Sequence, residues 1–213
     1  WYGGAKDART IDRKTYYDYP RAYKMIDELQ PQAVIFSDGG PGCRWVGNEN
    51  GFAGATNWSF LRAGEVYPGY PKYRELQYGH ADGNQWVAAE CDVSIRPGWF
   101  YHPEEDDKVK TVDQLTDLYY RSVGHNATLL LNFPVDRNGL IHPTDSLNAV
   151  SFHLRVQKEL ADNLLSSAKV SASDERGGQF KVRAVTDGKY DTYWATNDLS
   201  LIHISEPTRL GMI

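Results

Sequence analysis

Three short apolar runs that alternate with helical patterns constrain the fold of this chain more than any other feature. The runs are Ala33–Phe36, Gln85–Glu90 and Ala127–Asn132. Apolar residues at helical spacing cover residues 20–30, 111–124 and 143–165. Strands that alternate with helices build a parallel sheet with helices on its faces, so we predict an α/β fold. The last helix should pack through its apolar side, formed by Leu147, Val150, Leu154 and Leu160.

Polar residues stand where each predicted strand ends. Asp38 follows the first run, Glu90 and Asp92 lie at the end of the second, and Asn132 closes the third. The carboxyl ends of parallel strands meet at one edge of the sheet, and this edge carries the chemistry in barrels and in doubly wound folds. The glycine motifs that bind nucleotides are missing, so a nucleotide fold has no support. We predict a functional site at this edge.

The segment between the first two strands, residues 38–84, is predicted to be irregular. It is rich in glycine, and loops of this length are usually functional or disordered. Several aromatic residues in its first half argue against disorder. The whole chain has 213 residues, which is too few for a complete (β/α)₈ barrel of about 250.

Charge and composition exclude several classes of function. The formal net charge is −5 and there is no basic block, which argues against binding to nucleic acid. No stretch approaches the roughly 18 apolar residues of a membrane-spanning helix. Cys43 and Cys91 lack the spacing of a zinc site and are predicted to be buried thiols rather than a disulfide. The run Glu104–Asp107 is interpreted as a solvated acidic loop rather than a calcium site, so we predict no metal in the functional site.

One stretch of the long loop has the composition of a sugar site. An arginine, a tryptophan and a glutamate, Arg44, Trp45 and Glu49, lie within six residues. Aromatic residues make up 13% of the chain, and such side chains line sugar sites as well as cores. Hydrolysis of a glycosidic bond needs two carboxyl groups, one of them protonated. For Glu49 the alternative is an ordinary exposed loop glutamate.

These residues belong to a sequence that resembles the α-L-fucosidases of glycoside hydrolase family twenty-nine. It is most similar to the branch that prefers α-1,3- and α-1,4-linked fucose. The segments that carry the resemblance are Tyr16–Pro20, Leu29–Pro41, Arg44–Glu49, Thr56–Trp58, Glu90–His102 and Leu129–Asn132. The resemblance covers about residues 1–165 and implies the C-terminal portion of a (β/α)₈-like barrel, incomplete in this chain.

The resemblance also implies roles for individual residues. Glu49 matches the general acid/base, Arg44 an arginine that hydrogen-bonds the fucose, and Trp99 an aromatic that packs on the sugar. The family's nucleophile is an aspartate in a Trp-x-Asp-Gly type of segment, which we expect just upstream of the first residue. Asp38 is the alternative nucleophile, although its strand position favours a supporting role in the site.

Glu90 and Asp92 are weaker candidates for contacts with the substrate. Both lie near the corresponding strand end. The alternative is that one or both hold Arg96 or Arg44 in place.

A second resemblance begins after the predicted barrel segment. Residues 168–177 and 184–195 resemble the first strands of a discoidin-type (coagulation factor five/eight type C) β-sandwich, so residues 166–198 are expected to start such a module. Its Asp187-Gly188 and Asp191-Thr192 match a turn that often holds a structural calcium ion. Residues 199–213 do not continue the motif and are expected to be a non-native tail.

Together, the two resemblances imply a secreted or periplasmic retaining exo-α-L-fucosidase. Its partners would be fucosylated oligosaccharides or glycoproteins, and catalysis would need no cofactor. The alternative is that the chain is a non-catalytic fragment that binds fucose or another carbohydrate.

Overall fold

The computed structural model describes residues 12–189 and 191–197. The chain divides into two compact units, Trp1–His153 and Leu154–Ile213. The expected site residues all lie in the first unit. The predicted tail, residues 199–213, lies outside the described residues.

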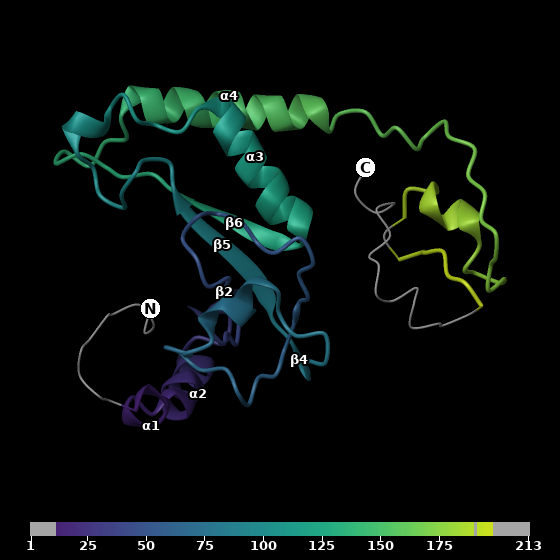
Figure 1. Cartoon of the computed structure of the whole chain (residues 1–213), viewed down its shortest axis with the longest axis horizontal. Coiled ribbons are helices and arrows are strands. Elements are labelled where there is room, and N and C mark those ends of the chain that lie inside the picture. Colours follow the sequence, from purple (N-terminus) through teal and green to yellow (C-terminus); the bar gives the residue numbers. More distant parts are fainter. Residues whose placement is uncertain (1–11, 190, 198–213) are drawn as a thin grey trace. The chain divides into compact units, whose positions relative to one another are not determined.

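A parallel sheet of four strands forms the centre of the first unit (Figure 1). Its order is β1-β2-β5-β6, and every neighbouring pair is parallel. The strands are β1 (Phe36–Ser37), β2 (Cys43–Trp45), β5 (Ala88–Ser94) and β6 (Ala127–Asn132). This confirms the predicted α/β fold with a parallel sheet. The strand β2 was not predicted, because three residues inside a glycine-rich loop show no usable periodicity.

The other elements are helices, a short antiparallel strand pair and 3₁₀ turns. The helices are α1 (Arg13–Tyr16), α2 (Tyr19–Leu29), α3 (Val112–Ser122) and α4 (Pro143–Glu159). A short antiparallel pair joins β3 (Phe60–Leu61) to β4 (Gln85–Trp86). Four 3₁₀ turns complete the described chain: η1 (Tyr73–Gln77), η2 (Pro103–Glu105), η3 (Val123–His125) and η4 (Val182–Val185).

The helix α3 begins and packs as its sequence predicts. Thr111 and Gln114 form a reciprocal capping box that satisfies two backbone N–H groups at the helix start. Leu115 and Leu118 are buried against Val93 of β5. α3 therefore covers one face of the sheet and leaves the opposite face to the polar side chains.

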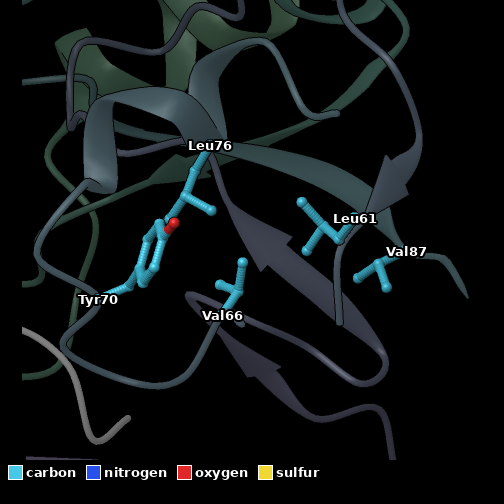
Figure 2. Close-up of a cluster of buried hydrophobic side chains, with 5 residues drawn as sticks. All are labelled: Leu61, Val66, Tyr70, Leu76 and Val87. Atoms are coloured by element: carbon cyan, nitrogen blue, oxygen red, sulfur yellow. The ribbon is translucent and has the colours of Figure 1, made fainter. Parts of the chain in front are cut away.

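The long segment between β2 and β5 is ordered by its own apolar cluster (Figure 2). The cluster consists of Leu61, Val66, Tyr70, Leu76 and Val87. Four of its five members come from the loop that the sequence predicted to be irregular, and Leu61 and Leu76 are completely buried. Burial of apolar surface therefore orders this loop where long helices and strands are missing.

Three predicted elements differ from the structure. The predicted strand Gln85–Glu90 is divided between β4 and β5, and β5 continues to Ser94, so Glu90 lies near the start of this strand rather than at its end. The first strand comprises Phe36–Ser37 rather than residues 33–36, and Val34 is 74% exposed. This strand stands at the edge of the sheet, where pairing and burial come from one side only. The last helix ends at Glu159. The four leucine and valine side chains through which it was expected to pack are more than half exposed.

The helix α4 packs against the rest of the first unit through residues that lie outside its predicted apolar side. Its buried residue is Asp145, and Phe152 packs against the cluster beneath α3. Apolar periodicity could not find this contact, because an aspartate is read as a surface residue.

Both cysteines are free and buried, as predicted. Burial, together with the nearby Glu90 carboxylate, raises the pKa of the Cys43 thiol to about 12. Burial likewise raises the pKa of Cys91 to about 12. Both thiols are therefore protonated and poor nucleophiles at neutral pH.

The second unit is described up to Asn197 and is built around turns. The Trp194 indole donates to the carbonyl of Asp174, whose carboxylate accepts from Asn197. Asp187 accepts from the hydroxyl of Thr192 within the turn that was expected to hold calcium. No β-strand is present in this described stretch beyond α4, so the β-sandwich module and its calcium site stay predictions.

Candidate active site

The polar side chains of the sheet lie on the face opposite α3. Successive residues of a strand point to opposite faces, so Glu90, Asp92 and Ser94 share one face of β5 while Val93 packs beneath α3. In β6, Asn132 is paired in register with Ser94. Its amide donates to the Ser94 hydroxyl over 3.1 Å. Adjacent strands thus contribute the polar side chains of this face, and Ser94 and Asn132 lie at the carboxyl edge where the sequence predicted a site.

Glu49 and Trp99 meet at the edge where these strands end. The loop after β2 carries Glu49, and the loop after β5 carries Trp99. The indole Nε1 of Trp99 donates to Oε2 of Glu49 over 2.9 Å. The turn before Glu49 requires a glycine at position 47, because its φ is +78° and a Cβ there would lie 2.2 Å from the carbonyl oxygen of Tyr73. Two residues that the sequence analysis predicted for the site are therefore direct partners.

Asp92 and Glu90 form the buried acidic part of the site. Asp92 accepts a hydrogen bond of 2.8 Å from the Trp45 indole. The pKa of Asp92 is raised to about 6, mainly by burial and also by the negative charges of Glu49 and Glu90, against the opposing effect of the Trp45 hydrogen bond. Burial also raises the pKa of Glu90, whose carboxylate lies 3.7 Å from the Cys43 sulfur. Protonation near neutral pH is therefore accessible at this face.

The buried Asp92 carboxylate should make stability depend on pH. Its pKa rises from 3.8 in the unfolded chain to about 6 in the fold, so the unfolded state loses the proton first as pH increases. As a result, the free energy of unfolding is unaffected by Asp92 below pH 3.8, decreases between pH 3.8 and about 6 as Asp92 titrates, and does not change further with this group above that pH. At about pH 7.5, Asp92→Asn should raise the free energy of unfolding by up to about 3 kcal/mol. The gain should vanish near about pH 3.

Urea unfolding of the chain at the two pH values measures this effect. The exposed Asp107→Asn is the matched control and should be neutral at both. An Asp92→Asn variant with the same stability difference at both pH values would contradict the titration of Asp92.

The structure places Arg44 differently from the sequence-based expectation. Its side chain is completely buried rather than open to a sugar. The guanidinium donates to the carbonyl oxygens of Leu76 and Val87, at 3.1 and 2.7 Å. It also donates to Asn57 and Trp58, at 2.6 and 2.8 Å. Arg44 is therefore a structural link between β2 and the long loop. This corrects the prediction that Arg44 contacts the fucose directly.

Asp38 is buried after β1 and accepts a hydrogen bond from the backbone N–H of Gly69. Asp38 thereby connects the end of β1 to the long loop. Its supporting role in the site stays a prediction.

Arg96 is held by residues that the sequence analysis did not select. Asp145 binds it through two hydrogen bonds of 2.8 and 2.9 Å, and both side chains are fully buried. Asp106 lies 2.9 Å from the same guanidinium. The alternative for Glu90 and Asp92 was that one or both hold Arg96 or Arg44. The described hydrogen bonds of these two carboxylates go to Cys43 and Trp45 instead, which does not support that alternative. The only sequence signal for Asp145 was an acid in the first turn of a helix, which usually indicates exposure.

Within the described residues, no group of three or more His, Cys, Asp or Glu side chains could hold a metal ion. None of the helices in the described part of the chain is long and apolar enough to cross a membrane.

No protein-family model matches this chain. An Arabidopsis thaliana protein named α-L-fucosidase 1 is 40% identical over 206 residues, which cover 93% of this chain and 39% of the relative. A solved glycoside hydrolase 29 family member from an unknown rumen bacterium is 47% identical, with a TM-score of 0.72 over 82% of this chain and 31% of that one.

The chain is a homologue of the glycoside hydrolase 29 α-L-fucosidases. A Ruminococcus gnavus fucosidase of this family, solved in complex with fucose, is 29% identical and has a TM-score of 0.71. That match covers 92% of this chain and 41% of the other. The chain spans 39% and 44% of the lengths of the Arabidopsis and rice relatives. The glycoside hydrolase 29 resemblance noted in the sequence thus agrees with both kinds of comparison.

Proposed function

We propose that this chain forms part of a retaining exo-α-L-fucosidase that releases terminal L-fucose from fucosylated oligosaccharides or glycoproteins. The observation that carries the proposal is the contact between Glu49 and Trp99 at the carboxyl edge of the sheet. A carboxyl group beside an aromatic ring fits a proton donor next to a sugar platform. Homology to proteins named α-L-fucosidases, one of them solved with fucose, supports the substrate class.

In this proposal Glu49 is the general acid/base. In the first step its carboxyl proton passes to the glycosidic oxygen as the bond to the leaving group breaks. In the second step the carboxylate takes a proton from water, which attacks the glycosyl-enzyme intermediate. Retention of configuration requires about 5–5.5 Å between Glu49 and the nucleophile carboxyl.

The nucleophile is proposed to come from a segment of the natural protein that precedes this chain. The limited share of the relatives that the chain spans, 39% and 44%, supports this division. The (β/α)₈-like barrel would then be completed by that segment, with β1 pairing to a further strand. Asp38 remains the alternative nucleophile within the chain.

The finer features rest on the sequence resemblance. We propose a preference for α-1,3- and α-1,4-linked fucose, a secreted or periplasmic location, and a discoidin-like module starting at about residue 166. Trp99, Asp92 and Glu90 would line the sugar pocket, and catalysis would need no cofactor.

The proposal is tested by assaying the complete protein and the 213-residue chain on a Lewis-type fucosyl oligosaccharide. We expect the complete protein to release fucose, with the α-anomer formed first in the NMR spectrum. The chain alone should not turn over. First formation of the β-anomer, or no fucose release by the complete protein, would overturn the proposal, and turnover by the chain alone would place the nucleophile at Asp38.

Calorimetry of the chain with fucose addresses the alternative function. Binding of fucose by the chain, together with no fucose release by the complete protein, would favour a carbohydrate-binding role.

A further inference from the structure

Glu49 reaches the sheet edge on an exposed loop with a single side-chain tether. Among the described residues its carboxylate accepts one hydrogen bond, the 2.9 Å contact from the Trp99 indole to Oε2. Glutamate has several rotatable bonds, and an exposed carboxylate without a tether samples several rotamers. The position of this carboxyl group therefore depends on where the Trp99 indole lies.

The backbone of Trp99 is itself held by the end of the neighbouring strand β6. The Asn132 side-chain amide donates to the Trp99 carbonyl oxygen over 3.1 Å and to the Ser94 hydroxyl over the same distance. Ser94 in turn accepts from the backbone N–H of Arg96 at 3.3 Å. A chain of hydrogen bonds thus runs from the ends of β5 and β6 to the Glu49 carboxylate on the loop after β2.

We propose that Trp99 is a positioning residue for Glu49, whose indole N–H fixes the Glu49 carboxyl group and selects its Oε1 as the proton-bearing oxygen. The proposal deepens the proposed function and rests on it. In a protonated carboxyl group the carbonyl oxygen is the better acceptor, so an N–H on Oε2 leaves the hydroxyl at Oε1. The proton then passes from Oε1 to the glycosidic oxygen, and Oε1 later takes one from water.

This role differs from simple stacking of the indole on the sugar. A ring that only stacks binds every fucoside equally, so its loss lowers kcat/KM to the same extent for all leaving groups. A residue that positions the proton donor matters only where the leaving group must be protonated. The two roles are therefore separated by the dependence of kcat/KM on the leaving group.

The test uses the complete enzyme with Trp99→Phe, which keeps an aromatic ring and removes the N–H. On a fucosyl oligosaccharide, kcat/KM should fall on the order of 10- to 100-fold, because a misplaced proton donor loses most of its effect. On a nitrophenyl fucoside, whose leaving group needs no proton, kcat/KM should change little. Trp86→Phe is the matched control, because Trp86 is 62% exposed on β4, outside the site, and should leave both values unchanged.

A second variant keeps the test valid if Trp99→Phe fails to fold. Incorporation of β-(3-benzothienyl)alanine at position 99 keeps the shape of the indole and replaces only the N–H by sulfur. It should reproduce the selective loss on the oligosaccharide, with an unchanged melting temperature.

The remaining outcomes overturn the proposal. Equal losses on both substrates would assign Trp99 to sugar stacking alone, and unchanged rates on both would remove it from the reaction. In either case Glu49→Gln distinguishes the causes. If Glu49→Gln still shows a loss confined to the oligosaccharide, only the role of Trp99 fails, whereas unchanged rates in Glu49→Gln would sink the proposed function itself.

Discussion

In the complete enzyme, Glu49→Gln should lower kcat/KM on a fucosyl oligosaccharide by about 10²–10⁴-fold, the usual contribution of general acid catalysis. Glutamine keeps the size of the side chain and an oxygen that can accept the Trp99 N–H, but it has no proton to give to the glycosidic oxygen. On a nitrophenyl fucoside, kcat/KM should change little, because departure of nitrophenolate needs no acid. The effect should therefore grow as the leaving group becomes more basic.

The second step offers an independent check on the same variant. Added azide attacks the glycosyl-enzyme intermediate without help from a base, so it should restore kcat for Glu49→Gln on the nitrophenyl substrate and yield fucosyl azide. Glu65→Gln is the control, because Glu65 is an exposed loop glutamate whose side chain lies 3.8 Å from Arg62. Equal activity of the Glu49→Gln variant and the unmodified enzyme on the oligosaccharide would contradict the assignment.

Asp145→Asn should reduce the free energy of unfolding by about 3–5 kcal/mol. In the wild-type chain, the Arg96 guanidinium donates two hydrogen bonds, of 2.8 and 2.9 Å, to the negatively charged Asp145 carboxylate. The variant removes this negative charge and leaves the positively charged guanidinium fully buried. An arginine side chain does not lose its proton in proteins, so Arg96 of the variant cannot escape this cost by deprotonation. Asp106 remains beside it at 2.9 Å but is partly exposed and does not replace the buried partner.

Urea unfolding of the chain and of two variants measures this loss. Asp117→Asn breaks an exposed pair with Arg121 on α3, at 3.5 Å, and should change stability by less than about 1 kcal/mol. An Asp145→Asn variant no less stable than this control would show that the buried pair does not hold α4 to the end of β5.

Much of the fold was predictable because helices and parallel strands leave periodic traces in neighbouring residues. The α3 helix shows this clearly, since Thr111 indicates its start and Leu115 and Leu118 its buried side. The same reasoning failed for α4, where the exposed leucines suggested a core and the buried Asp145 did not. Periodicity reports which side of a helix is apolar, but it cannot report which side meets the rest of the molecule.

The candidate site was predictable in part for the same reason. Strand-end carboxyl groups could be selected from the sequence, and Glu49 and Trp99 could be selected from the resemblance to fucosidases. The role of Arg44 could not, because its burial depends on the carbonyl oxygens of Leu76 and Val87, which the loop brings together only on folding. A hydrogen bond to a backbone carbonyl leaves no trace in residue types.

The amino-acid sequence alone was sufficient for the order of elements, the parallel sheet and the edge at which polar residues gather, because each depends on residues close together in the chain. Tertiary structure was needed to show which polar groups meet. Glu49 and Trp99 are 50 positions apart, and Arg96 and Asp145 are 49 apart. Contacts over such separations arise from the packing of whole strands and loops. Burial then determines which of the carboxyl groups stay charged and which, like Asp92, hold a proton close to neutral pH.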